Sequence, residues 1–268
     1  MKNTIKETQK LTKSLFFYDI IGIENKIEII WAHGWGMDHK SMKPLADSLK
    51  NIGKHYIIDL PGFGKSTKPK KVWGTKNYSE YMAKWIKKLP SNLKNTKRIW
   101  VGHSFGSKIG IDLASNHPEL IDGLFLIAAA GIKIRRNFLE KMILKYKIFY
   151  YKFCKKIILA LGLSENYLQN YFGSIDYKNA KELKNILIKI VSEDMIESAK
   201  KIKCPVYLIF GSKDNETPPE IGINYKRLIP KSKLFILKNQ DHHSLIELGK
   251  HQVINILKKF IQNILKYD

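Results

Sequence analysis

Short apolar runs alternate with longer amphipathic segments through the first half of the chain. The short runs are rich in β-branched and aromatic residues, which is typical of β-strands, whereas the longer ones repeat their apolar positions at helical spacing. The expected strands are residues 14–21, 26–34, 55–62, 98–104 and 121–131, and the expected helices are 41–51, 78–89 and 106–118.

The same alternation returns near the C-terminus. Strands are expected at 205–211 and 233–239, with helices at 220–229 and about 246–265. Strands that alternate with helices indicate a mostly parallel sheet flanked by helices on both faces. The runs "RIWV" and "LFLIAAA" have the continuous apolar character of strands covered on both sides. The pattern therefore predicts the α/β class.

Residues 132–200 interrupt this alternation. They contain helical patterns but no convincing buried strand, so we expect a helical cap inserted into one core. The predicted division is a first core part at 1–131, the cap at 132–200 and a second core part at 201–268. A chain of 268 residues is long enough to bury such a core.

A serine stands between two glycines where one strand turns into a helix, in "WVGHSFGSKIG". Ligands of open parallel sheets bind at the carboxyl ends of the strands, and Ser104 lies at such an end. The following helix N-terminus favours developing negative charge, and the cramped turn explains Gly102 and Gly106. A Gly-x-Ser-x-Gly pattern also arises by chance, but its strand–turn–helix setting favours a nucleophile over an ordinary turn.

Two later loops supply the groups that a serine nucleophile needs. A serine hydroxyl requires a base to take its proton, and the base requires an acid to orient it. The loop "FGSKDNETPP" contains Asp214, and the loop "NQDHHSLIE" contains His242 and His243. Both loops follow predicted strands, so their side chains should meet Ser104 at one sheet edge.

Together these segments resemble the α/β-hydrolase superfamily. The resemblance covers nearly the whole chain, through "WAHGWG", "DLPGFGKS", "GHSFGS", "FGSKDNETP" and "DHHSLIE". The most similar members in character are cofactor-independent serine hydrolases and esterases with a helical cap, including esterases of carrier-protein methyl esters. The resemblance implies that Ser104 is the nucleophile, Asp214 the orienting acid and His242 the base.

The resemblance also separates the two histidines and suggests an oxyanion hole. Family members place an acidic residue five positions after the catalytic histidine, and Glu247 satisfies that spacing for His242. Asp241 departs from the family pattern, since it stands where a glycine is usual. By the same resemblance, the backbone N–H groups of Trp35 and Phe105 would hold the oxyanion, and His33 would be structural.

The reaction implied is hydrolysis of a carboxylic ester through an acyl-enzyme. Hydrolysis of carbon–carbon bonds of the meta-cleavage type, perhydrolysis and amide cleavage use the same triad and stay open. Haloalkane dehalogenases and epoxide hydrolases are set aside because they need an aspartate in place of Ser104. No cofactor is expected, and no ligand spacing indicates a metal site.

The net charge of +23 comes almost entirely from lysine. Arginine, on which nucleic-acid readers usually depend, occurs only at four positions, so no nucleic-acid partner is expected. A compositional bias explains most of the charge, although a basic binding module on a hydrolase fold is the non-enzymatic alternative. The arginines are Arg98, Arg135, Arg136 and Arg227.

One stretch of the predicted cap, residues 133–162, is amphipathic. At helical spacing its lysines gather on one face and its apolar residues on the other. The basic face is either an ordinary solvated face or a docking face for an acidic carrier protein or an anionic surface. The lysines are Lys141, Lys145, Lys152 and Lys156, and the apolar positions are Ile143, Tyr146, Tyr150, Cys154 and Ile157.

The location expected from the sequence is the cytoplasm. No apolar run is long enough to span a bilayer, and the N-terminal residues lack the apolar core of a signal peptide. Cys154 and Cys204 are expected to be reduced thiols. The sequence leaves the oligomeric state and the natural acyl and alcohol groups open.

Overall fold

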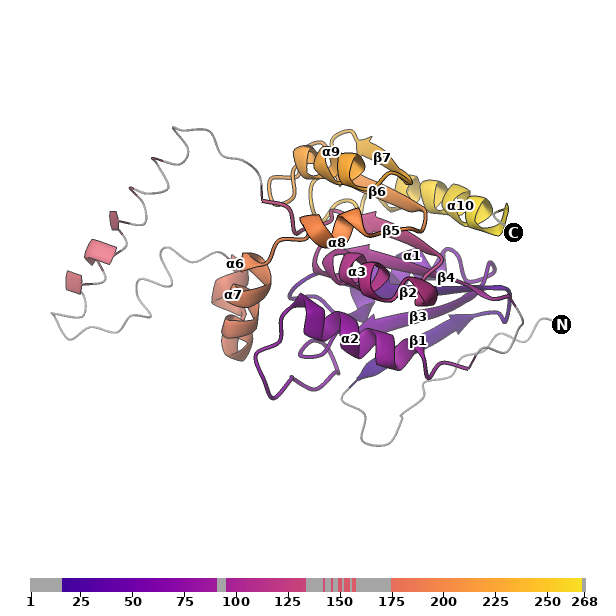
Figure 1. The fold of residues 1–268 in the computed structure, drawn as a ribbon, viewed down its shortest axis with the longest axis horizontal. Coiled ribbons are helices and arrows are strands. Elements are labelled where there is room, and N and C mark those ends of the chain that lie inside the picture. Colours follow the sequence, from indigo (N-terminus) through magenta and orange to yellow (C-terminus); the bar gives the residue numbers. More distant parts are fainter. Residues whose placement is uncertain are drawn as a thin grey trace.

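A seven-stranded sheet forms the centre of the molecule in a computed structural model, which describes residues 16–90, 95–133 and 175–266 and a few isolated positions between 142 and 157 (Figure 1). The strand order is β1-β3-β2-β4-β5-β6-β7, and all neighbours are parallel except β1 and β3. The strands are β1 (Phe17–Gly22), β2 (Ile27–Ala32), β3 (Lys54–Asp59), β4 (Lys97–His103), β5 (Gly123–Ile127), β6 (Val206–Gly211) and β7 (Ser232–Leu237). The α/β prediction with a mostly parallel sheet is confirmed.

Helices cover both faces of the sheet, and each face has its own hydrophobic cluster. One face packs against α1 (His39–Asp47) and α10 (Lys250–Lys266). The other packs against α2 (Thr75–Ile86), α3 (Phe105–Asn116), α8 (Ile196–Lys200) and α9 (Pro219–Leu228), while the short 3-10 turn η1 (Pro118–Leu120) follows α3. The two layers explain why β2, β3, β5 and β6 are buried along their whole length.

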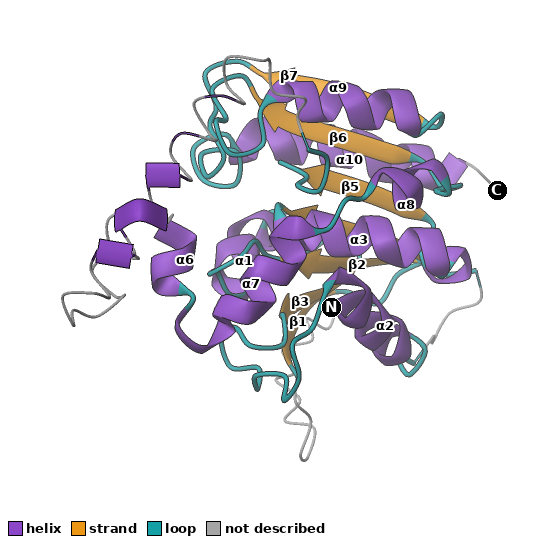
Figure 2. Cartoon of the chain, turned by 60° about the vertical axis from the view of Figure 1, so that its left-hand side comes forward, coloured by secondary structure: helices purple, strands orange, loops and turns teal. Residues whose placement is uncertain are grey.

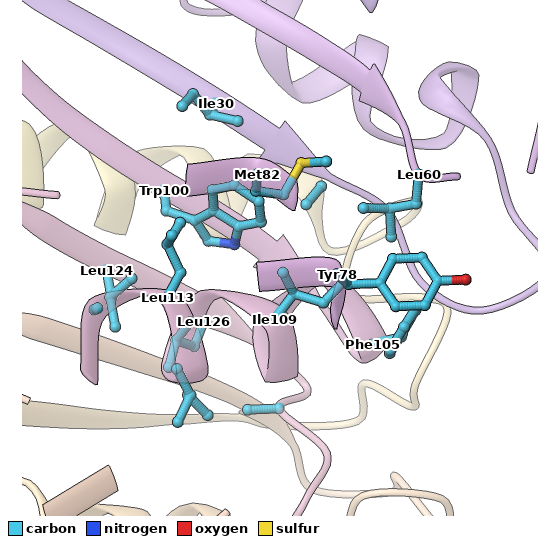
Figure 3. Packing of buried hydrophobic residues seen from close by; sticks show 14 of the residues in the cluster. Ile30, Leu60, Tyr78, Met82, Trp100, Phe105, Ile109, Leu113, Leu124 and Leu126 are labelled. Carbon is cyan, nitrogen blue, oxygen red and sulfur yellow. The ribbon is translucent and has the colours of Figure 1, made fainter. Parts of the chain in front are cut away.

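The contact between α3 and the sheet sets the position of the serine turn. Trp100 of β4 is fully buried in the same cluster as Met82 and Ile109, whose side chains lie beside it (Figure 3). Its indole Nε1 donates to the carbonyl of Gly106 over 2.9 Å. A Cβ on Gly110 would lie 2.4 Å from Trp100 Cδ1, so only glycine lets the helix come this close. Burying a side chain such as Met82 contributes about 2 kcal/mol.

The first strand differs from the central strands. Along β1 buried residues alternate with half-buried ones, as expected of an edge strand with one face toward the core. It runs antiparallel to β3, with Phe17 opposite Asp59. Its alternating pattern predicts a strand but does not specify the partner or the direction, which the sheet decides.

The described part of the predicted cap is helical and contains no strand between residues 175 and 200. It consists of α6 (Ile175–Asn179), η2 (Lys181–Leu183), α7 (Lys184–Ser192) and α8. Helix α6 lies on the side to which the arrowheads of β5 and β6 point (Figure 2). Lys141 and Lys145 of the predicted basic face lie outside the described residues, whereas Lys152 and Lys156 are exposed. The domain boundaries stay a prediction.

A polar anchor ties the end of α7 to the core. Lys108 of α3 is buried, and its Nζ donates to the carbonyls of Ile190 and, over 3.0 Å, of Glu193. The carboxylate of Glu193 in turn accepts from the N–H and the hydroxyl of Thr75, at 2.9 and 2.5 Å. Burial lowers the pKa of Lys108 to about 8, against the opposing charge of Glu193. The cap segment is thereby held against both α3 and α2.

Among the described residues, no helix combines the length and the apolar character needed to cross a membrane.

Candidate active site

Ser104 occupies a strained turn between β4 and α3. Its backbone has φ 48° and ψ −105°, a conformation that residues other than glycine rarely adopt. The turn leaves no room on either side: a Cβ on Gly102 would lie 2.4 Å from the Ser107 nitrogen, and one on Gly106 would lie 2.2 Å from the Ala32 oxygen. The surrounding packing therefore maintains the strain and projects Ser104 from the sheet edge.

Asp214 and His242 meet from the loops after β6 and β7. His242 Nδ1 lies 2.8 Å from Asp214 Oδ2. The other carboxylate oxygen accepts from the N–H groups of Glu216 and Thr217 at 2.9 and 2.8 Å, and the Thr217 hydroxyl donates to Oδ2 over 2.8 Å. Burial acts to raise the pKa of Asp214, but the bonds from His242 and Thr217 hold it below its usual value. Asp214 is thus an ionised acceptor for His242.

The two neighbouring histidines have different surroundings. The His242 side chain is 7% exposed and that of His243 is 54% exposed. Burial opposes the charged form of His242, but the hydrogen bond and charge of Asp214, followed by Glu216 and Asp176, raise its pKa. His242, which the family spacing favours, is therefore the histidine paired with Asp214.

Ser104 and His242 line two adjoining cavities. We call the first, of about 330 Å³, the acidic lobe; it is lined by Gly34, Trp35, Met37, His103, Ser104, Asp176, Glu216, His242 and His243. The second, of about 260 Å³, is the apolar lobe, with Ile132, Leu187, Ile190, Val191 and Ile221 among its walls. Within the described part of the chain no hydrogen bond joins Ser104 and His242, a looseness common in unliganded catalytic sites.

The amides proposed for the oxyanion hole have no acceptor. Neither the Trp35 nor the Phe105 N–H donates a hydrogen bond to any described residue. Phe105 is only 4% exposed, and buried unpaired amides are rare in folded proteins. Both residues line the apolar lobe beside Ser104. Two donors without an acceptor among the described residues therefore belong to walls of the cavity that Ser104 lines.

His33 supports this turn and is not a titrating group. Its Nε2 accepts from the Leu60 N–H over 3.0 Å, so its Nδ1 carries the proton and donates to the Gly34 carbonyl over 2.7 Å. Complete burial lowers the pKa of His33 to about 4. The structural role expected from the sequence matches these contacts, which hold the segment that carries Trp35.

Several site residues escaped the sequence analysis. Thr217 and Glu216 follow Asp214 closely. Because an Asp side chain often accepts from the backbone N–H groups two or three residues later, the sequence does contain a signal for these contacts. Asp176 comes from α6, and nothing local in the sequence connects it with the serine. His103, which directly precedes Ser104, supports the last loop, since its Nε2 lies 3.0 Å from the His242 carbonyl.

One cluster outside the site has metal-ligand chemistry. Ligand atoms of Asp38, His39 and Asp59 lie within 4.8 Å of one another. The Asp59 carboxylate, however, accepts from the N–H groups of His39 and Lys65 at 2.6 and 2.8 Å and lies 2.8 Å from His39 Nδ1. These bonds hold the loop after β3 in place, which accounts for the cluster. Only the fold brings its members together, which is why no ligand spacing is visible in the sequence.

Comparison with known proteins identifies similar chains. A family model described as the alpha/beta hydrolase fold matches residues 29–153. The pimeloyl-acyl-carrier-protein methyl ester esterase of Wigglesworthia glossinidia brevipalpis is 26% identical over 228 residues, covering 80% of this chain and 84% of that protein. Lipase 1 of Psychrobacter immobilis is 26% identical over 234 residues, covering 82% and 72%.

The solved structures agree on the fold. One is a serine hydrolase involved in carbazole degradation, with a TM-score of 0.69, 20% identity and coverage of 92% of this chain and 94% of that one. At this identity the likeness is one of fold.

Proposed function

Because this chain belongs to the α/β-hydrolase superfamily and is a hydrolase of the esterase and lipase type, we propose that it cleaves carboxylic esters through an acyl-enzyme on Ser104. The observation that carries the proposal is the 2.8 Å bond between Asp214 and His242 beside the cavities that Ser104 lines. The strained Ser104 backbone and the two unpaired amides support it independently.

In the first step, Ser104 Oγ attacks the ester carbonyl while His242 Nε2 takes the hydroxyl proton. Asp214 stays ionised and stabilises the imidazolium that forms, since the hydrogen bonds it accepts favour its charged form. The carbonyl oxygen becomes negative and accepts from the Trp35 and Phe105 N–H groups. Preorganised donors of this kind contribute about 3–4 kcal/mol each to transition states elsewhere.

The intermediate then collapses, and the bond between the acyl carbon and the alcohol oxygen breaks. His242 gives its proton to the departing alkoxide, which leaves as the alcohol. Water then attacks the acyl carbon while His242 takes one of its protons. The bond between the acyl carbon and Ser104 Oγ breaks, His242 returns the proton to Oγ, and the carboxylic acid leaves. Apolar walls such as Leu187, Ile190 and Ile221 suit the apolar lobe to the acyl chain.

A carrier-bound ester is the substrate class that we propose for the cell. The relative from Wigglesworthia is named for such an ester, and the net charge of +23 would attract an acidic carrier. Steering of this kind is screened by salt, with a Debye length of about 10 Å at 0.1 M. We expect kcat/KM for a carrier-bound ester to fall steeply with salt, while kcat/KM for a small neutral ester changes little.

The experiment that tests the reaction uses a fluorophosphonate probe and a panel of p-nitrophenyl esters of increasing chain length. The probe should label the wild-type protein on Ser104, because only an activated serine reacts with it. A meta-cleavage-type dienoate and an amide in the same panel test the competing reactions. No labelling together with no ester turnover would contradict the serine mechanism.

A further inference from the structure

The acidic lobe has a charge opposite to that of the chain as a whole. The protein carries a net charge of +23, yet neither lysine nor arginine is among the described residues that line this lobe. Its charged walls are the carboxylates of Asp176 and Glu216. A positive protein therefore presents a negative pocket beside its candidate nucleophile.

The two carboxylates come from different segments of the chain. Glu216 stands in the loop after β6, with Oε2 3.7 Å from His242 Nε2 and Oε1 3.6 Å from His243 Nε2. Asp176 stands in α6 of the cap segment. Partial burial raises the pKa of Asp176, and the nearby charge of Glu216 raises it further, so the two groups sense each other across the lobe.

A neutral histidine lines the same lobe. His103 is 1% exposed, and its Nε2–H donates to the His242 carbonyl, which leaves Nδ1 as an unprotonated acceptor. Burial lowers the pKa of His103 to about 3, so the ring stays neutral. Its Nδ1 has no hydrogen-bond partner among the described residues and faces Gly34, another wall of the lobe. The lobe thus offers the negative charge of its carboxylates, and the buried His103 adds no positive charge to it.

We propose that Asp176 and Glu216 select the charge of the alcohol part of the ester, so that cationic alcohols react best, neutral ones less well and anionic ones worst. The inference rests on the proposed function, and it places the acyl chain in the apolar lobe and the alcohol in the acidic lobe. A positive group there is attracted by both carboxylates, and the ring of Trp35 offers a face for an ammonium group. A carboxylate or sulfonate in the alcohol meets two like charges.

Asp176 and Glu216 also border the apolar lobe, but there they stand with lysines and apolar walls. Its lining includes Lys108 and Lys133 as well as Glu193. Lys108 Nζ is directed to the carbonyls of Ile190 and Glu193, and Lys133 is exposed. Of the two cavities that Ser104 lines, the acidic lobe is therefore the one in which the described walls oppose the two carboxylates with no lysine.

The test uses three butyrate esters whose alcohols differ in charge but little in size. They are butyrylcholine, its uncharged isostere 3,3-dimethylbutyl butyrate, and 2-sulfoethyl butyrate. We expect Glu216→Gln and Asp176→Asn each to lower the cation-to-neutral ratio of kcat/KM by about threefold to tenfold. The double variant should bring this ratio close to the value set by the intrinsic reactivity of the two esters. Comparing each variant with wild type cancels the intrinsic reactivity of the esters.

Glu220→Gln is the matched control. Glu220 is an exposed acid at the start of α9 and does not line the lobe, so this variant should keep the wild-type ratio. Because Glu216 is 56% exposed, the selection should also weaken between low and high salt.

The two proposals fail in different ways. An enzyme that hydrolyses all three esters with the same charge order in wild type and in the double variant overturns the charge selection alone. A protein that neither reacts with a fluorophosphonate nor hydrolyses any of the esters overturns the proposed function itself. Retained labelling in Glu216→Gln and Asp176→Asn shows that the variants keep an activated serine, so that any change in the ratio reports on substrate charge.

Discussion

The two ends of the sheet carry cavities that differ in every respect that matters for chemistry. The cavity at the amino ends of the strands has a volume of about 470 Å³. At the carboxyl ends, the acidic lobe of about 330 Å³ borders a further hollow of about 860 Å³ at Trp35 and Asp176. None of the residues that line the cavity at the amino ends has a positive φ, and the Tyr207 hydroxyl in its wall accepts from Asn263 over 2.6 Å. Its lining is Lys97, Asp122, Pro205, Tyr207, Pro230, Lys231, Ser232, Lys233, Phe260, Asn263 and Ile264.

At the carboxyl ends, by contrast, the residues around the cavities have backbone strain and unmet hydrogen-bonding capacity. Ser104 has a positive φ, the Trp35 and Phe105 amides donate to no described residue, and a buried histidine pairs with a buried aspartate. These features cost stability, and a fold retains them where they serve a reaction. Volume alone does not separate the two ends, since both carry cavities of several hundred Å³. The distribution of strain points to the end where parallel sheets bind ligands.

The largest expected effect is the loss of the nucleophile. Ser104→Ala should lower kcat for p-nitrophenyl esters by about 10⁴–10⁶, because the residual rate then depends on the oxyanion donors alone. The fold should persist, as judged by an unchanged circular dichroism spectrum. A variant with a tenth of the wild-type rate would place the chemistry elsewhere and break the contrast between the two sheet ends.

His242→Ala should match the serine variant, whereas His243→Ala should change kcat by less than about tenfold. His242 holds Asp214, while His243 is half exposed and contacts Glu216. Because Ser104 and His242 act as a unit, the double variant Ser104→Ala/His242→Ala should be little worse than either single one. Steady-state rates for the four proteins check this, and an inactive His243→Ala would instead make His243 the base.

Lys108→Met should lower the free energy of unfolding by about 1–3 kcal/mol, since the carbonyls of Ile190 and Glu193 lose their buried donor. The matched control, Lys189→Met, removes an exposed lysine whose Nζ lies 3.3 Å from the Val72 carbonyl, and it should cost much less. Urea denaturation measures both. Equal losses would show that the buried anchor contributes no more than a surface contact.

The pH dependence of the same variant has a definite sign. The pKa of Lys108 is about 8 in the folded protein and about 10.5 in the unfolded chain, so the unfolded chain binds more protons between these values. Lys108 therefore makes stability rise with pH across that window. Lys108→Met should lack this rise, which unfolding measured from pH 7.5 to 10.5 detects.

Glu216→Gln should move the acid limb of kcat/KM to lower pH. His242 acts as a base only when neutral, and the negative charges of Asp214, Glu216 and Asp176 raise its pKa. Removing one of these charges favours the neutral ring. A pH profile with a neutral ester measures the shift, and Glu220→Gln should leave the limb in place. A limb that moves to higher pH would contradict the assigned sign.

The smallest effect is expected at the amino end of the sheet. Lys231→Glu and Lys233→Glu reverse two exposed charges at the cavity at the amino ends of the strands. Each should change kcat/KM for a small neutral ester by less than about twofold. Surface substitutions away from a site rarely do more. A tenfold loss would mean that this cavity takes part in catalysis and would remove the contrast drawn above.

The order of the core elements could be predicted from the sequence because their signals are local. Seven apolar runs correspond to the seven strands, and helical spacing marks α1, α2, α3, α9 and α10. The strained turn was equally visible, since a serine between Gly102 and Gly106 after a buried strand leaves few conformations open. The antiparallel direction of β1 was not, because an alternating pattern fixes which face is buried and not which strand lies beside it.

The sequence by itself indicated the candidate reactive residues, Ser104, Asp214 and a histidine of the last loop, because each follows a strand and parallel strands end at one edge of a sheet. The family resemblance favoured His242 over His243. Only the tertiary structure decided their surroundings. Asp176 and Glu216 are 40 residues apart in a lysine-rich chain, and Lys108 looks like any surface lysine until α7 covers it. Burial and electrostatic interaction depend on distances in space, and a local pattern of residues does not specify the distances between segments that are far apart in the chain.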